Sequence, residues 1–169
     1  QDSSSAASDV YKRQGHRWDY DHWASLGNEG WSYDEILKYF KKAEHNETFD
    51  DEFHGQGGPL NVSKIRHENK PTKDFVEAGS KLYKQNEDFN GGEQEGIGFY
   101  QTTQKDGKRC SAAKAYLVPA LDRPNLTVIT EANVNKILID NNKASGVEYI
   151  DAEGESHIIS ASKEVLLCS

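Results

Sequence analysis

The chain has 169 residues, enough for one domain and too few for two large ones. Its formal net charge of −8 argues against nucleic acid or an anionic membrane as the main partner, because both require a basic surface. No apolar run approaches the roughly 20 residues of a spanning helix, so no transmembrane segment is predicted. Only 35% of the residues are hydrophobic, so either the core is thin or apolar faces need partners from outside the chain.

The first 14 residues differ in character from the rest of the chain. They are rich in Ser and Ala, show no periodicity and lack the apolar stretch of a signal peptide. Ser4–Gln14 reads like the in-frame translation of a transposase adapter used to prepare sequencing libraries. We therefore predict a non-native leader over residues 1–14, with native sequence from about Gly15; the alternative is an ordinary disordered N-terminus. The chain also stops inside an apolar, strand-like run, Glu164–Cys168, so we expect a reading frame cut at both sides.

A capping box begins the first clearly predicted helix, Ser32–Glu44. The Ser32 hydroxyl can accept from the backbone three residues on, and Glu35 can reach back to the Ser32 N–H. Apolar residues then recur at helical spacing. A dense aromatic cluster precedes and overlaps this start, and two interpretations are open: a small satellite core, or a lid over a cofactor or substrate. Its members are Trp18, Tyr20, Trp23, Trp31 and Tyr33.

The middle of the chain alternates turn-rich and helical patterns. His45–Gly58 is acidic and glycine-rich and is predicted to be an exposed loop. Pro71 suits the first turn of a second helix, Pro71–Tyr83. Further elements are expected as follows: a short strand at Leu60–Val62, a glycine-rich loop at Asn86–Gly98, a strand at Phe99–Thr103, a turn at Lys105–Lys108, and a third helix at Ser111–Leu117 that Pro119 stops.

From Leu126 the pattern changes to β-strands separated by tight turns. The turn signals are Asp140–Lys143 and Asp151–Gly154. They predict an antiparallel β-meander, followed by Glu164–Cys168, and hence an α+β fold class. The predicted strands are Leu126–Thr130, Val134–Ile139, Gly146–Ile150 and His157–Ser160.

Local catalytic and metal-binding motifs are missing from the sequence. It contains no GxGxxG, phosphate-binding loop, HExxH or GxSxG pattern. Cys110 and Cys168 lie far apart and outside any CxxC pattern, which favours free thiols, buried or half-buried, over a disulfide or a zinc site. No spacing of histidines and acidic residues fits a familiar ligand pattern, so no metal site is predicted.

A series of short strings, in order along the chain, resembles the glucose–methanol–choline (GMC) oxidoreductase family, and most closely its choline dehydrogenase-like alcohol dehydrogenases. The strings cover nearly the whole chain from Gly15 to Cys168. They are Asp19-Tyr-Asp21-x-Trp23, Gly27-Asn28-x-Gly30-Trp31-Ser32-Tyr33, Tyr39-Phe40-Lys41-Lys42-x-Glu44, Gly58-Pro59-Leu60-x-Val62, Asp88-Phe89-Asn90-Gly91, Gln94-x-Gly96-x-Gly98-x-Tyr100-Gln101, Gly107-x-Arg109-x-Ser111-Ala112-Ala113-x-Ala115-Tyr116-Leu117 and Arg123-Pro124-Asn125-Leu126-x-Val128.

The resemblance implies an FAD-dependent enzyme that oxidises an alcohol (a CH–OH donor) to an aldehyde or ketone by hydride transfer to the flavin. It further implies a flavin-lid and partial substrate-domain segment over residues 15–110, and a partial FAD-binding domain with the meander over residues 111–169. The family's pyrophosphate-binding strand–GxGxxG–helix unit and its catalytic histidine region have no counterpart here. We therefore assign no catalytic residue and expect the isolated chain to be inactive.

Four residues can be carried over from the family pattern. Thr130-x-Ala132-x-Val134 matches a segment whose last valine binds adenine through its backbone, although Val134 could also be an ordinary strand residue. Cys168 ends a strand that runs near the adenosine half of FAD; the family usually continues Ala-Gly, where this chain has Ser169. Tyr100 and Gln101 are expected toward the substrate cavity.

The resemblance also implies two kinds of partner: a small-molecule alcohol, and the missing N- and C-terminal parts of the same protein. The alternative function is a non-catalytic binding or structural module derived from this family. Whether the enzyme would be a dehydrogenase or an oxidase, and whether its substrate is choline, a long-chain alcohol or an aromatic alcohol, stays open at this point.

Overall fold

The computed structural model describes residues 14–168, so the predicted leader up to Arg13 lies outside the described residues. The chain divides into two compact units, Gln1–Asp122 and Arg123–Ser169, which we call the first and second unit. The boundary between these units follows Asp122, and the domain division predicted after residue 110 stays a prediction. Among residues 14–168, no helix is long and apolar enough to cross a membrane.

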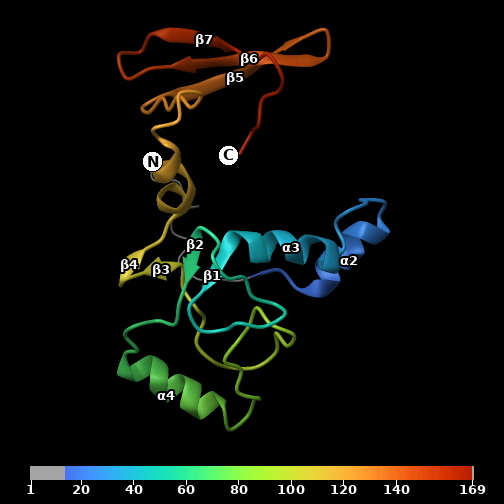
Figure 1. The fold of residues 1–169 in the computed structure, drawn as a ribbon, viewed down its shortest axis with the longest axis vertical. Helices are drawn as coiled ribbons and strands as arrows, with labels where there is room; N and C mark the ends of the chain where they lie inside the picture. Colours follow the sequence, from blue (N-terminus) through green and yellow to red (C-terminus); the bar gives the residue numbers. More distant parts are fainter. Residues whose placement is uncertain (1–13, 169) are drawn as a thin grey trace. The chain divides into compact units, whose positions relative to one another are not determined.

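The first unit begins with two capped helices, α2 (Arg17–Ser25) and α3 (Tyr33–Ala43) (Figure 1). The predicted capping box is present at the start of α3, where the Glu35 carboxylate accepts from the Ser32 backbone N–H at 3.3 Å. The helix ends at Ala43, with Glu44 as its C-cap in an extended conformation. The helix predicted over Ser32–Glu44 is therefore confirmed.

The aromatic cluster packs between α2 and α3. The Tyr20 ring lies at the centre, with its centroid 5.4 Å from Trp23 and 5.8 Å from Phe40. Trp23 in turn makes an edge contact with Trp31 at 5.7 Å. These contacts form a satellite core. Its three tryptophans nevertheless keep much of their surface in solvent: Trp18 63%, Trp23 44% and Trp31 50%.

The segment predicted as an exposed loop after α3, His45–Gly58, is confirmed only in part: seven of its fourteen residues are exposed and three are buried. It opens with the strand β1 (Glu44–Asn46), which pairs in parallel with β2 (Leu60–Val62), the short strand that was predicted. Within it, Asn46 and His54 are each only 2% exposed. The acidic and glycine-rich composition suggested solvent, but these polar groups are satisfied by hydrogen bonds inside the protein.

The second predicted helix is shorter than expected. α4 (Lys70–Gly79) starts where the Asn69 side chain accepts from the Thr72 backbone N–H at 2.9 Å, with Pro71 in its first turn. It does not continue to Tyr83, because a tighter turn follows Gly79: the Lys81 amide donates to the Ala78 carbonyl at 3.3 Å and the Leu82 amide to the Gly79 carbonyl at 2.9 Å, each three residues back. Leu82 is 81% exposed, so no buried face extends the helix.

The end of the first unit departs from two further predictions. Phe99–Thr103 forms no regular strand, and its pairing is a single bridge between Ser63 and Thr102. The predicted turn at Lys105–Lys108 is confirmed as a hairpin between β3 (Gln104–Lys105) and β4 (Lys108–Arg109). The third helix is a π-helix, η1 (Ala113–Leu117), and Pro119 does not stop it, since a 3₁₀ turn, η2 (Val118–Ala120), follows directly.

The second unit is a three-stranded antiparallel sheet in the order β5-β6-β7 (Figure 1). Its strands are β5 (Asn133–Asp140), β6 (Lys143–Ile150) and β7 (Ser156–Ser160). Asn141 and Asn142 both have positive φ, 48° and 61°, as a tight hairpin turn requires. Three of the predicted strands are thus present, but Leu126–Thr130 and Glu164–Cys168 were wrongly predicted as strands, because neither pairs with another described segment.

Buried residues concentrate in the first unit. Within residues 14–122, five apolar residues are buried: Tyr33, Ile36, Val62, Cys110 and Ala115. Both cysteines are free thiols; Cys110 is buried as predicted, whereas Cys168 is exposed, contrary to the prediction. Helices and strands are mixed along the chain, which agrees with the predicted α+β class at this coarse level.

Candidate functional site

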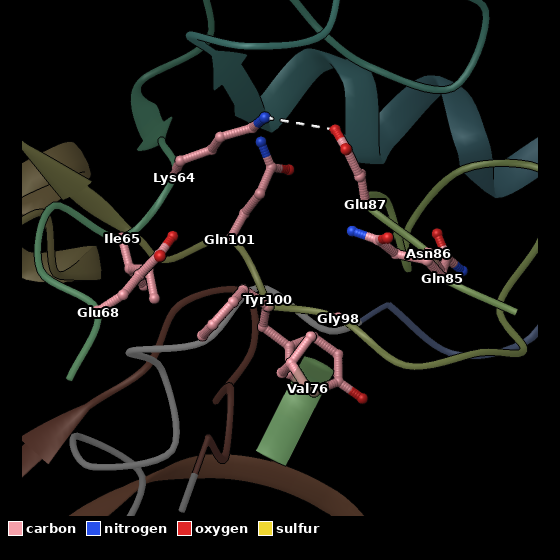
Figure 2. A pocket seen from close by; sticks show the side chains of 11 residues that line it. Lys64, Ile65, Glu68, Val76, Gln85, Asn86, Glu87, Gly98, Tyr100 and Gln101 are labelled. Atoms are coloured by element: carbon pink, nitrogen blue, oxygen red, sulfur yellow. Dashed lines mark ion pairs between the residues drawn. The ribbon is translucent and has the colours of Figure 1, made fainter. Parts of the chain in front are cut away.

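A cavity of about 240 Å³ in the first unit collects residues from four segments (Figure 2). Both residues predicted to be near the substrate, Tyr100 and Gln101, lie on its wall. The cavity mixes apolar and polar side chains, as small-molecule sites commonly do. Its lining consists of Lys64, Ile65, Glu68, Val76, Gln85, Asn86, Glu87, Gly98, Phe99, Tyr100 and Gln101.

Tyr100 belongs to the apolar part of this lining. Its ring packs on Phe89, with the ring centroids 4.6 Å apart, and 39% of the residue remains exposed. Figure 2 shows Tyr100 together with Val76 of α4 among the side chains that line the cavity. Another part of the lining is charged, where Lys64 pairs with Glu87 at 3.6 Å. Both of these charged side chains are more than half exposed, so the pair adds little stability.

Gln101 turns its amide into the protein. It forms a reciprocal pair with Asn46: the Asn46 Nδ2 donates to Gln101 Oε1 at 3.0 Å, and the Gln101 Nε2 donates to Asn46 Oδ1 at 3.1 Å. Gln101 is 3% exposed. Its polar atoms are therefore used to anchor the cavity wall.

Behind this amide pair lies a group that the sequence analysis missed: Glu44, His54 and Asp88, which we call the buried bridge. The His54 Nδ1 lies 3.1 Å from Glu44 Oε2, and its Nε2 lies 2.9 Å from Asp88 Oδ2. The side chains of His54 and Glu44 are 0% and 1% exposed, and that of Asp88 is 19% exposed. Phe49 stacks against the imidazole with its centroid 5.2 Å away.

The buried bridge strongly perturbs the titration of His54. Burial alone, the largest single effect, lowers the pKa of His54 because it disfavours the charged ring. The hydrogen bonds and negative charges of Asp88 and Glu44 together outweigh burial and raise the pKa from 6.5 to about 9. At neutral pH the ring is therefore an imidazolium between two carboxylates.

Backbone contacts explain why these residues meet. Glu44 Oε2 also accepts from the Gly55 backbone N–H at 3.0 Å, which draws the loop that follows Phe49 onto β1. A Cβ at Gly55 would lie 1.9 Å from the Lys41 carbonyl oxygen, so only glycine fits beside His54. The sequence signal for this site is Glu44, directly after a helix, followed ten positions later by the pair His54-Gly55. No local sequence motif links these residues.

The other two predicted site residues lie in the second unit. Val134 is on β5, where it pairs with Tyr149, and is 55% exposed. Cys168 is exposed and outside the strands. The structure thus brings Tyr100 and Gln101 together on one cavity wall, and it places Val134 and Cys168 in the unit formed by residues 123–169.

Comparison with known proteins identifies the family. A sequence model of the GMC oxidoreductases matches residues 3–169, and the chain belongs to this family. It is 48% identical over 150 residues to the alcohol dehydrogenase [acceptor] of Pseudomonas putida, covering 88% of this chain and 27% of that protein. It is 43% identical over 166 residues to the mitochondrial choline dehydrogenase of Homo sapiens, covering 98% and 28%.

Solved structures show the same relationship in three dimensions. The pyridoxine 4-oxidase from Mesorbium loti superposes with a TM-score of 0.83 at 30% identity, covering 92% of this chain and 31% of that one. An FAD-dependent oxidoreductase from Chaetomium thermophilum gives 0.82 at 27% identity, covering 92% and 29%. The chain therefore spans less than a third of the length of the relatives it matches. The predicted family is confirmed, and FAD as the cofactor is supported by these matches.

The edge strand of the second unit offers the kind of backbone groups that bind an adenine ring. β5 is an edge strand of the sheet, so part of its backbone N–H and C=O groups face away from β6. A main-chain N–H and C=O on such an edge can pair with the donor and acceptor of an adenine ring, as expected at Val134. Residues 14–168 contain no glycine-rich turn between a strand and a helix of the kind that binds a pyrophosphate.

Proposed function

We propose that this chain is a segment of an FAD-dependent oxidoreductase that converts an alcohol, a CH–OH donor, into an aldehyde or ketone. The observation that carries the proposal is the family match over residues 3–169, with relatives named as alcohol and choline dehydrogenases. When bound, FAD supplies the hydride acceptor for such a reaction. The proposed partners are the alcohol and the segments of the protein that lie outside this chain.

In this proposal, residues of this chain hold the alcohol and FAD in position. None of them is assigned as catalytic. Tyr100 and the Gln101 backbone form a wall against which the alcohol packs. Val134 and Cys168 contribute to holding the adenosine half of FAD. No histidine lines the described cavity, and so we place the catalytic base outside this chain.

The division of the chain is part of the same proposal. Residues 15–110 are proposed as the flavin-lid and partial substrate-domain segment, and residues 111–169 as part of the FAD-binding domain. The half-exposed tryptophans on α2 and before α3 support a lid, because their apolar surface is available to cover a flavin.

Anaerobic reduction of the flavin tests the function. The protein expressed from the complete gene should carry bound flavin that is bleached by choline, a long-chain alcohol or an aromatic alcohol. The 169-residue chain alone should bind little or no flavin. A complete protein without flavin would favour the alternative, a non-catalytic module, and stoichiometric flavin on the isolated chain would contradict the proposed division. Repeating the assay in air separates an oxidase from a dehydrogenase.

Substitution of Tyr100 tests the proposed cavity wall. Tyr100→Ala removes the ring of the wall and should raise the KM for the alcohol by about 10-fold or more, while leaving the flavin content unchanged. Tyr39→Ala is the matched control, because Tyr39 is 60% exposed on α3 and does not line the cavity. An equal KM for the two variants would mean that Tyr100 is not part of the substrate site.

A further inference from the structure

The buried bridge joins three segments that the proposed chemistry does not use. Glu44 is the first residue of β1, His54 follows the turn at Asp51, and Asp88 lies in the loop that leads to Phe89. Asp88 also accepts from the Asn90 backbone N–H at 3.0 Å, which fixes its own loop. A charged group this deeply buried is costly unless each of its polar atoms has a partner, so the partners of His54 must be counted.

Asn46 and Glu44 both face the Nδ1 of His54. The Asn46 Oδ1 accepts from the backbone N–H groups of Thr48 and Phe49, both at 3.0 Å, which fixes the orientation of the amide. The two Nδ2 hydrogens then have acceptors in Gln101 Oε1 at 3.0 Å and Glu44 Oε1 at 3.5 Å. The His54 Nδ1 lies 3.0 Å from the same Nδ2 and 3.1 Å from Glu44 Oε2. Because a carboxylate oxygen accepts, the contact with Glu44 assigns a hydrogen to Nδ1. With Nε2 donating to Asp88, both ring nitrogens carry hydrogen.

The charges around the ring agree with this state. Three carboxylates surround His54: Glu44, Asp88 and Asp51, whose Oδ1 accepts from the His54 backbone N–H at 3.2 Å. On α3, Lys41 directs its Nζ to the Glu52 carbonyl oxygen, to which it donates at 2.9 Å. An imidazolium therefore reduces the negative charge of the cluster.

The buried bridge reaches the cavity wall by two routes. On one side, Glu44 and His54 contact Asn46, which is paired with Gln101. On the other side, Asp88 precedes Phe89, whose ring supports Tyr100 at 4.6 Å. The routes end on adjacent residues of one wall.

We propose that His54 is a positioning residue: by bonding Glu44 and Asp88 at once, it holds Asn46 and Phe89 in place and so fixes the Tyr100–Gln101 wall of the cavity. That an alcohol packs against this wall rests on the proposed function, whereas the position of the wall does not. The two ideas can therefore fail separately.

NMR of the isotope-labelled 169-residue chain tests the positioning role without any ligand. At about pH 7 both imidazole nitrogens of His54 should give signals of an N–H, and the ring should lose a proton near pH 9. The side-chain amide signals of Asn46 and Gln101 should shift with the same midpoint. A neutral His54 at about pH 7, or Gln101 signals that do not follow the His54 titration, would overturn the proposal.

A pair of histidine variants sharpens the test. In His54→Gln the Gln101 side-chain amide should exchange with solvent about tenfold faster, and the contact between the Phe89 and Tyr100 rings should weaken. His157→Gln is the matched control, since His157 also bonds a carboxylate, Asp151 Oδ2 at 2.6 Å, but lies in the second unit. It should leave the Gln101 and Tyr100 signals in place. Unchanged signals in a folded His54→Gln chain would contradict the proposal; should that variant not fold, the titration of the unmodified chain decides.

Discussion

The two units of the chain are stabilised in different ways. Among the described residues of the first unit, ten polar or charged ones are buried against five apolar ones, and they are joined by side-chain hydrogen bonds. In the second unit, Gly146 is the one buried residue among residues 123–168, and strand pairing supplies the order. The first unit therefore depends on particular side chains, and the second on the fit of its backbone.

This difference decides how each unit should respond to substitution. Removing one partner of a buried charged group leaves the other without compensation, so single polar changes should be severe in the first unit. Side-chain changes on the exposed surface of the sheet should be mild, and changes that push its strands apart should be severe. Because all three tryptophans lie in the first unit, their fluorescence reports that unit, whereas far-UV circular dichroism includes the sheet.

Glu44→Gln should give the largest effect. It removes the charge that faces His54 and is expected to cost about 3–5 kcal/mol of unfolding free energy in the first unit. Urea unfolding followed by tryptophan fluorescence measures this loss. Glu52→Gln is the matched control, since its side chain is exposed, and should stay within about 0.5 kcal/mol. Similar losses in the two variants would mean that the buried bridge does not stabilise the unit.

Raising the pH should weaken the first unit and spare the second. The pKa of His54 is about 9 in the folded chain and 6.5 ordinarily, so its stabilisation is complete below pH 6.5 and is lost as the pH rises through 9. The difference corresponds to about 3 kcal/mol. Unfolding curves at intervals across this range should show the loss, and the same series on His54→Gln should not. A flat profile for the unmodified chain would contradict the assignment.

Gly146→Val should act on the sheet alone. A Cβ at this position would lie 2.3 Å from the Ile159 carbonyl oxygen, so the variant must separate β6 from β7. We expect a loss of about 1–3 kcal/mol in the sheet signal, with unchanged tryptophan fluorescence. Ala144→Val, on the same strand, should be milder. If fluorescence changed as strongly as the sheet signal, the two units would not be independent.

Ser32→Ala should have the smallest effect of this series. It removes the hydroxyl of the α3 capping box and is expected to cost about 1 kcal/mol, measured by tryptophan fluorescence. Ser25→Ala, whose exposed hydroxyl donates to the His22 carbonyl at the end of α2, should change stability less. Identical values would show that the box does not start the helix.

Local signals predicted the elements that depend on local chemistry. Ser32 and Glu35 marked the start of α3, and the Asn141-Asn142 pair marked the hairpin between β5 and β6. Predictions failed where a distant partner decides the outcome. Leu126–Thr130 has the composition of a strand but no described strand beside it.

The candidate site could be predicted only in part. Resemblance pointed to Tyr100 and Gln101, and both line one cavity. The sequence did not reveal the buried bridge, because Asp88 is 34 positions from His54. In addition, the acidic, glycine-rich segment around His54 has the composition of a solvated loop. Only the folded chain shows that the side-chain amides of Asn46 and Gln101, 55 positions apart, form hydrogen bonds with each other.

The central claim is that this chain is a segment of an FAD-dependent alcohol oxidoreductase. Reading the source DNA outward through both sides of the frame tests it most directly. The account predicts an upstream strand–GxGxxG–helix unit and a downstream region that contains the catalytic histidine. A start codon directly before Gln1 together with a stop codon directly after Ser169 would contradict it, and the chain would then be a free-standing module of the GMC family.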